Sequence, residues 1–162
     1  MNIYIQCGGR KMSDFNLVGK CGLYCGACTI YRAERDNQDW RSELASQFNC
    51  SSEQVRCNGC GSLTNECWGS GCKIVMCINS KGHKFCFECN EYKNNNCDKF
   101  SKVANRYAER SKIDLRANLM MIQNGETESW LEESKNRFSC RICGRPVVAG
   151  SKTCHHCNKD MI

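Results

Sequence analysis

The sequence has little of what usually builds a hydrophobic core or a catalytic site. It contains one proline, three histidines and only 9% aromatic residues. Its longest strongly apolar run covers residues 74–78, far short of the roughly 20 apolar residues that cross a membrane. We therefore expect no membrane span. None of the histidines lies in a recognised catalytic motif, which argues against most histidine-dependent enzymes.

The beginning of the chain lacks the features of an exported protein. Residues 1–20 contain no continuous apolar stretch of the kind found in a secretory signal. Residues 1–11 match nothing that follows, and Met12 looks like an equally good start. We therefore expect residues 1–11 to be a disordered extension whose Cys7 is not a metal ligand. Many thiols without an export signal predict a reducing cytoplasm, where disulfides are disfavoured.

Cysteine, by contrast, is abundant, with seventeen among 162 residues. Two thiolates separated by two residues sit on one tight turn and can grip a single metal ion. The odd total argues against complete disulfide pairing. Five pairs have this spacing: Cys25/Cys28, Cys57/Cys60, Cys86/Cys89, Cys140/Cys143 and Cys154/Cys157.

The residue after the second cysteine also favours metal over disulfides. Four of the pairs are followed by Gly61, Asn90, Gly144 or Asn158. A metal knuckle curls so that its N–H groups point at the sulfurs, and that curl needs a positive φ. Glycine adopts a positive φ freely and asparagine with little strain, so we expect one at all four positions.

Hydrophobic periodicity predicts helices on both sides of the cysteine-dense part. A helix over residues 29–48, with Thr29 as a possible N-cap, would place Trp40, Leu44 and Phe48 on one face. Residues 98–138 are predicted to be helical throughout. Ser111 would cap the second helix there, Gly125 would follow its end, and Thr127 would open the third.

These elements predict a small metal-stabilised α+β fold. A cysteine-rich metal-binding domain would cover residues 17–98, and a helical segment over residues 99–138 would pack on it. A zinc ribbon would occupy residues 139–162, with one knuckle on each of two hairpin turns. His155 and His156 lie inside the second knuckle and could compete as ligands, but both knuckles are complete without them.

The order of the cysteine motifs resembles a known family. The motifs are Cys21-Gly22-Leu23-Tyr24-Cys25-Gly26-Ala27-Cys28, Cys57-Asn58-Gly59-Cys60, Gly71-Cys72-Lys73-Ile74 with Cys77, and Phe85-Cys86-Phe87-Glu88-Cys89 with Cys97. Together they resemble the cysteine-rich Domain of Unknown Function 3795 family, over roughly residues 17–160. Thr29 and Asn96 stand where proline is usual, and Cys67 is extra. The resemblance implies a metal-rich cytoplasmic module and no particular reaction.

The number of cysteines limits how many metal sites the chain can form. Twelve cysteines lie between residues 21 and 97, and Cys50 has no partner nearby, so we expect it to be a buried thiol. Two four-ligand sites would use eight of the other eleven, whereas three sites would need His83 as well. The preferred interpretation is two metal sites with spare thiols. The spacing of the cysteines does not show which of them share a site. The candidate ligands are Cys21, Cys25, Cys28, Cys57, Cys60, Cys72, Cys77, Cys86, Cys89, Cys97, Cys140, Cys143, Cys154 and Cys157.

The leading functional hypothesis is a zinc-stabilised binding or adaptor module with about two to three zinc ions and a protein partner. Nucleic acid is weakly supported, because bound thiolates would offset the formal charge of +6. The basic residues near the ribbon are more simply explained as part of an ordinary solvated surface than as a nucleic-acid site. They are Lys135, Arg137, Arg141, Arg145, Lys152 and Lys159.

Two other classes remain open. Cys21, Cys25 and Cys28 have a spacing that suits a cubane iron–sulfur cluster, with Cys67, Cys77 or Cys97 as the fourth ligand and zinc kept in the ribbon. Such a protein would have a redox or cluster-carrier role. An enzyme would instead need a thiol beside a base, or an open zinc site, and the sequence favours a non-enzymatic role.

Overall fold

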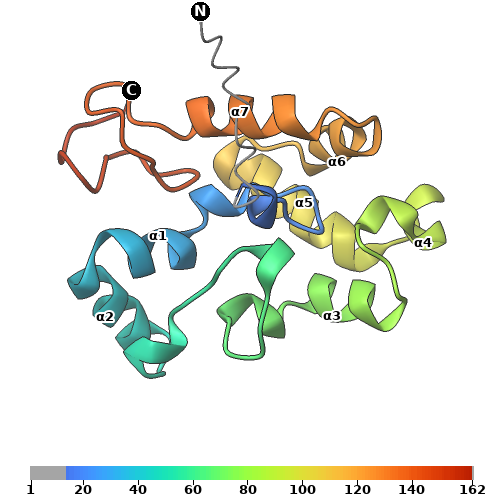
Figure 1. Ribbon diagram of the computed structural model, residues 1–162, viewed down its shortest axis with the longest axis horizontal. Coiled ribbons are helices and arrows are strands. Elements are labelled where there is room, and N and C mark those ends of the chain that lie inside the picture. Colours follow the sequence, from blue (N-terminus) through green and yellow to red (C-terminus); the bar gives the residue numbers. More distant parts are fainter. Residues whose placement is uncertain (1–13, 162) are drawn as a thin grey trace, which may run out of the picture.

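The computed structural model describes residues 14–161, and these are mostly helices joined by short loops (Figure 1). Residues 1–11, with the predicted extension and Cys7, lie outside the described residues. No helix in the described part combines the length and apolarity that crossing a bilayer requires. The helices are α1 Thr29–Asp36, α2 Gln38–Gln47, α3 Lys73–Ser80, α4 Asn90–Lys93, α5 Asp98–Ser111, α6 Leu115–Gln123 and α7 Thr127–Arg137.

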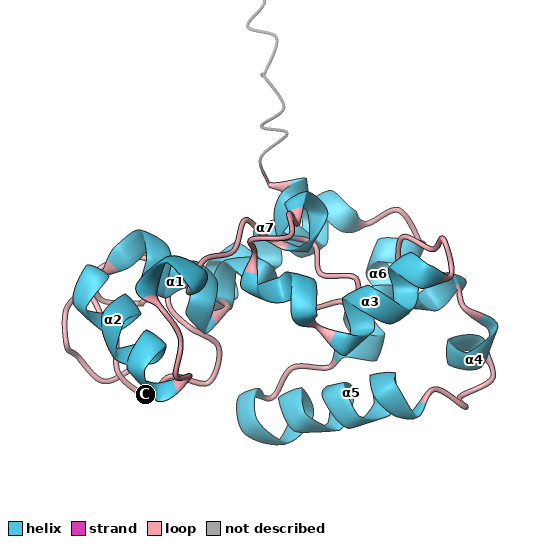
Figure 2. Cartoon of the chain, turned by 90° about the horizontal axis from the view of Figure 1, so that it is seen from below, coloured by secondary structure: helices cyan, strands magenta, loops and turns pink. Residues whose placement is uncertain are grey.

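The predicted α+β class is not confirmed, because β structure is almost absent from residues 14–161 (Figure 2). Pairing is limited to three isolated antiparallel bridges. Both C-terminal hairpins pair through a single residue on each side, which is too little to form a strand. The bridges are Val18–Tyr24, Ser139–Pro146 and Thr153–Asp160.

The main hydrophobic core joins the cysteine-rich part to the later helices. Phe100, Leu115 and Leu119 have essentially no exposed surface. The Tyr24 ring stacks on Phe138 with centroids 6.1 Å apart and meets Trp130 edge to face. These contacts link the first cysteine motif to α7, so the helical segment over residues 99–138 forms one core with it.

A second core lies under α1 and α2, and here the predicted helix over residues 29–48 is interrupted. Asn37 is extended, with φ −160°, and its side chain accepts a hydrogen bond from Trp40 N at 3.0 Å. The asparagine thus caps α2 and ends the continuity. Leu44 is buried, whereas Phe48, expected on the same face, is 44% exposed and packs on Trp68.

The later helices begin and end close to the predicted positions, with one error. Ser111 is the last residue of α5 and does not cap α6. Asp114 is the cap, and its carboxylate accepts from the N–H groups of Arg116 and Ala117 at 2.9 and 3.1 Å. The end of α6 before Gly125, at φ +85°, is confirmed. The start of α7 at Thr127 is also confirmed.

Gly22 provides a test of this packing. Its φ is +84°, and an added Cβ would lie 2.7 Å from the Leu115 carbonyl oxygen. We expect Gly22→Ala to lower the free energy of unfolding of the metal-bound protein by about 3 kcal/mol, since backbone strain and overpacking add. Gly82→Ala is the matched control, because Gly82 has φ +66° and open space around it. It should cost about 1 kcal/mol. Equal losses in denaturant titrations would contradict the close approach of Gly22 to α6.

Candidate metal centres

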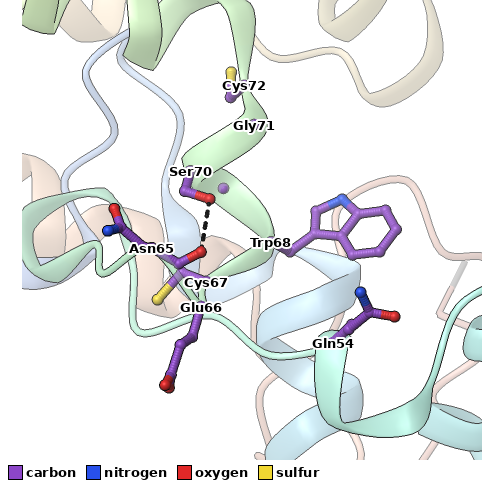
Figure 3. Close-up of a pocket in the computed structure, with 9 residues that line it drawn as sticks. Gln54, Asn65, Glu66, Cys67, Trp68, Ser70, Gly71 and Cys72 are labelled. Carbon is purple, nitrogen blue, oxygen red and sulfur yellow. Dashed lines mark hydrogen bonds between the residues drawn. The ribbon is translucent and has the colours of Figure 1, made fainter.

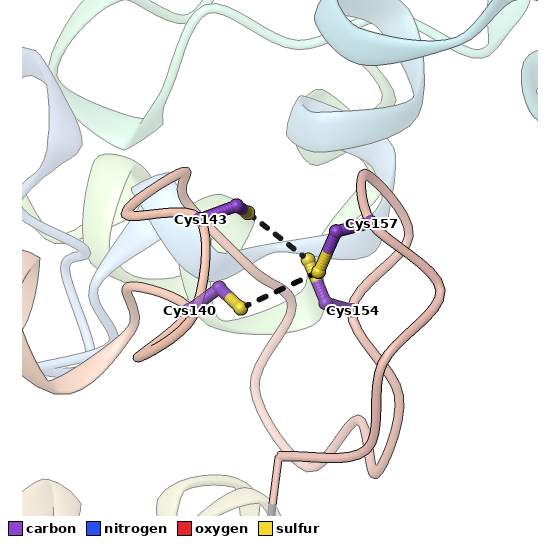
Figure 4. Close-up of side chains that lie close together, drawn as sticks. All are labelled: Cys140, Cys143, Cys154 and Cys157. Atoms are coloured by element: carbon purple, nitrogen blue, oxygen red, sulfur yellow. Dashed lines mark hydrogen bonds between the residues drawn. The ribbon is translucent and has the colours of Figure 1, made fainter.

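The clearest candidate centre is a four-cysteine cluster at the C-terminal end (Figure 4). The sulfurs of Cys140 and Cys157 are 3.8 Å apart, and those of Cys143 and Cys154 are 3.7 Å apart. All four lie within 4.8 Å of one another. Four sulfurs at about 2.3 Å from one tetrahedral ion would be about 3.8 Å apart, so the donor set fits a single ion.

Local backbone geometry builds each half of this cluster. Gly144 has φ +72° and Asn158 has φ +54°, as predicted for the residue after each second cysteine. The curl brings Ile142 N to 3.4 Å from the Cys140 sulfur. The N–H groups of Cys143 and Ile142 lower the pKa of Cys140 to about 6. The backbone thus favours the thiolate, which is the form that binds metal.

The cluster is anchored to α1 through the two histidines that were considered as competing ligands. His155 Nε2 and His156 Nε2 lie 2.9 and 3.5 Å from Asp36 Oδ2, and His156 Nε2 also lies 3.0 Å from the Pro146 carbonyl oxygen. The Arg32 guanidinium, which is largely buried, lies 3.7 Å from the same Asp36 oxygen. Asp36, His155 and His156 could together hold a metal ion by distance alone. Because Arg32 already supplies the positive charge there, the group is better explained as an anchor.

Four helices of the described chain begin directly after a cysteine. The N-cap residues of α1, α3, α4 and α5 are Cys28, Cys72, Cys89 and Cys97. A helix N-terminus offers unpaired N–H groups and a partial positive charge, both of which stabilise a thiolate. At Cys89, burial raises the thiol pKa, but the α4 N–H groups and a lysine outweigh it, so the pKa lies below its ordinary value. The fold therefore places these thiols where they can act as anionic ligands.

This arrangement overturns the predicted positive φ at two of the four pairs. Asn90 is the first residue of α4, and Gly61 lies in the 3-10 turn Cys60–Ser62. Neither has a positive φ, and Gly59 at φ +90° makes the turn before Cys60 instead. The reason is that the second cysteine of a core pair leads into a helical turn, whereas in the C-terminal cluster it leads into a hairpin.

One group of core cysteines surrounds a small cavity. Cys77, Cys86, Cys89 and Cys97 line a space of about 10 Å³, which has room for about one water-sized particle. Burial raises the pKa of Cys86, and the neighbouring sulfurs raise it further. A bound cation would relieve this mutual repulsion, which makes these four thiols candidate metal ligands.

Two lysines contact this first core group. Lys81 Nζ lies 3.3 Å from the Cys89 sulfur, and Lys99 Nζ lies 3.6 Å from the Cys77 sulfur. Four thiolates around a divalent ion carry a net charge of −2, which two ammonium groups would balance. Sequence reasoning missed both lysines, because no motif or spacing links a lysine to a cysteine that it meets only in the folded chain.

A second core group contains Cys21, Cys25, Cys28 and Cys60. Cys60 N lies 3.4 Å from the Cys25 sulfur. A hydrogen bond from the Cys25 thiol lowers the pKa of Cys60 to about 7. Burial raises the pKa of Cys21 to about 12, and the nearby Cys60 and Cys72 sulfurs add to the rise. Cysteines from two separate motifs thus meet here.

Four described cysteines remain outside these groups, although Cys72 lies near the Cys21 sulfur. Cys57 and Cys67 are buried in the second hydrophobic core, with Cys50 packed against it, and Cys72 is exposed. Among residues 14–161 every cysteine is a free thiol. In the same residues, no three core cysteine sulfurs come within 4.8 Å of one another, unlike those of the C-terminal cluster. His83 joins no cysteine group and lies 3.8 Å from Glu88.

The hollow around Trp68 and Gly69, of about 560 Å³, has few groups suited to catalysis (Figure 3). Cys67 and Cys72 line it, and the Ser70 hydroxyl donates to the Asn65 carbonyl oxygen at 3.3 Å. No histidine belongs to its described lining, and its carboxylate, Glu66, is ion-paired with Arg56. The hollow therefore offers its cysteines no evident general base.

The Lys81 contact makes a testable prediction. Residues that contact a metal ligand typically change metal affinity by about 10–100-fold when mutated, so Lys81→Met should bind its core metal about tenfold more weakly. Lys81→Arg should largely retain the affinity. Lys93→Met removes an exposed lysine at the end of α4 and is the control. Competition with a chromophoric chelator measures the effect, and equal affinities of Lys81→Met and the wild type would show that the contact has no influence.

These features define a small, cysteine-rich helical protein with possible metal-binding sites and a C-terminal four-cysteine cluster. The chain belongs to the DUF3795 family, described as a protein of unknown function, whose sequence profile matches residues 17–102. The resemblance inferred from the cysteine motifs is thereby confirmed. The match ends within α5, before the C-terminal cluster. No curated protein and no solved structure gives a significant match.

Proposed function

We propose that this protein is a metal-binding module stabilised by zinc, with a closed four-thiolate site at Cys140, Cys143, Cys154 and Cys157. The observation that carries the proposal is the spacing of these sulfurs, 3.7 and 3.8 Å across the two knuckles. Closed thiolate sites of this geometry are structural and leave no position for a substrate. Function would then reside on the surface that the metal holds in shape.

The core cysteines extend the proposal to a total of about two to three metal ions. Cys77, Cys86, Cys89 and Cys97 would form one site, supported by their common cavity and the two adjacent ammonium groups. The second would use Cys21, Cys25, Cys28 and Cys60, supported by the short approach of Cys60 to Cys25. The remaining cysteines would then be spare thiols.

A specific observation favours one alternative, an iron–sulfur cluster in the core with zinc at the C-terminal end. The core sulfurs lie farther apart than those of the C-terminal cluster. A cubane cluster holds its four cysteines around several iron atoms and needs a wider span than a single ion. The helix start behind Cys28 would supply N–H groups to a cluster in the second core group, and the one behind Cys97 would do so in the first. The protein would then carry electrons or clusters.

We propose that the protein binds a protein partner in the cytoplasm. Phe48 and Trp68 are 44% and 40% exposed and pack against each other at 4.7 Å, which suits a protein contact. The basic residues near the C-terminal cluster are a weaker basis for nucleic acid. Lys135 already pairs with Asp14 at 2.7 Å, and Arg137 donates to the Lys112 carbonyl.

X-ray absorption at the zinc edge of the purified protein tests this function. We expect a first shell of four sulfurs at about 2.3 Å. Oxygen or nitrogen ligands in place of sulfur would mean that the C-terminal cluster is not the zinc site. An iron signal with iron–sulfur and iron–iron distances would favour the alternative in the core.

A further inference from the structure

A basic hollow lies beside the cysteine core, between α3 and α5. Its volume is about 490 Å³, within the range of small-molecule pockets. Figure 2 shows the two helices on the same side of the molecule, with α5 as the long helix along its edge. The hollow shares Cys72 with the one around Trp68 and Gly69, but that second hollow is lined mainly by neutral residues.

The charges around this hollow are mostly of one sign. Lys73 comes from α3, while Lys99, Lys102 and Arg106 come from one face of α5 at the spacing i, i+3, i+7. Asp98 is the single acid in the described lining. Lys99 also contacts the Cys77 sulfur, so the other three cations and Asp98 leave a formal charge of +2. In the described part of the chain, Lys73, Lys102 and Arg106 make no ion pair. Their mutual repulsion is therefore uncompensated within the protein.

The backbone adds to this positive potential. The first turn of α3 lines the hollow at Lys73 and Ile74, and the N-cap residue Cys72 makes no side-chain capping hydrogen bond. The first N–H groups of a helix have no partner within the helix and carry part of its dipole. A helix start of this kind favours anions, phosphate groups in particular. Charge and backbone thus point to the same class of ligand.

We propose that this hollow binds a small ligand with two or more linked phosphate groups, such as a nucleoside triphosphate or inorganic polyphosphate. Lys73, Lys102 and Arg106 make no ion pair in the described chain and come from two helices, so they offer donors for more than one phosphate group. Ile74 and Val103 form an apolar wall against which the body of a nucleotide can pack. A single strand of nucleic acid would need stacking aromatic rings, and the described lining contains none.

The test is calorimetric titration of the full-length, metal-loaded protein at low ionic strength with tripolyphosphate and, separately, with ATP. Lys102→Glu/Arg106→Glu should weaken binding of both by about tenfold or more, since two charge-assisted contacts become repulsive. Lys93→Glu/Lys159→Glu reverses the same number of charges away from the hollow and should change affinity by less than about twofold. Metal content should be unaffected in both variants, which separates this site from the proposed metal centres.

The two ligands distinguish the possible sources of phosphate. Equal affinities would assign recognition to the phosphates alone, and tighter binding of ATP would add the apolar wall as a nucleoside contact. Either result supports the proposal. It is overturned if neither ligand binds, or if both double variants weaken binding equally. It is also overturned if an oligonucleotide binds more tightly than ATP and loses affinity in Lys102→Glu/Arg106→Glu, because the surface would then be a nucleic-acid interface.

Discussion

Replacing Cys154 by serine is expected to remove one zinc ion per chain and to unfold residues 139–161. Cys154 has no exposed surface, and its sulfur faces that of Cys143 at 3.7 Å. A serine hydroxyl is neutral and a poor zinc ligand. Structural zinc contributes about 10–16 kcal/mol in small metal-folded units, so its loss exceeds the stability that this short segment can supply otherwise.

The effect should extend to the contacts that anchor the C-terminal cluster on Ala27 and on α1. Ala149 N donates to the Ala27 carbonyl oxygen at 3.0 Å, and His155 contacts Asp36. Both contacts should be lost, and hydrogen exchange should rise in residues 139–161 and at the end of α1. Cys50→Ser is the control, because Cys50 is half-buried and belongs to no cysteine group. Unchanged zinc content in Cys154→Ser would mean that zinc is held elsewhere.

Removing the metal from the core is expected to unfold residues 50–97 while α5, α6 and α7 partly persist. The core-forming side chains of that stretch are few, chiefly Val55, Ile74, Val75 and Ile78. The cysteines that hold its ends together are brought near one another by the fold, but their buried thiols raise each other's pKa. Without a cation, the stretch has too little buried surface to offset its conformational entropy.

Hydrogen exchange with mass spectrometry, in a strong chelator under reducing conditions, measures this loss segment by segment. Residues 50–97 should lose protection from exchange. The segment around Phe100, Leu115 and Leu119 should keep part of its protection because it has an apolar core. The untreated protein in the same reducing buffer is the control. If all metal is removed and residues 50–97 remain protected, metal is not what orders them.

The features that the sequence predicted well are local ones. The two C-terminal knuckles lie on either side of ten residues, so their spacing alone brings four sulfurs together. The end of α6 and the start of α7 follow from Gly125 and Thr127, because each residue affects only the helical turn next to it. The family resemblance was predicted from short motifs for the same reason.

The features that the sequence did not predict depend on contacts between distant parts of the chain. Cys60 meets Cys25 across 35 residues, and Lys99 meets Cys77 across 22 residues. No periodicity encodes such pairs. Helices α3 and α4, which follow the N-caps Cys72 and Cys89, were also missed, because a cysteine motif fits a knuckle turn and a helix start equally well. Asn37 interrupted a pattern that was otherwise continuous, since its side chain offers a cap to α2.

Elemental analysis of protein purified without air tests the central claim, that closed thiolate sites bind zinc, most directly. The proposed function predicts about two to three zinc ions per chain with negligible iron and no acid-labile sulfide. In Cys154→Ser, prepared in parallel, the zinc content should fall by one. About four iron atoms per chain with matching sulfide would contradict zinc in the core and establish an iron–sulfur cluster there. A wild-type protein without bound metal would contradict the account as a whole.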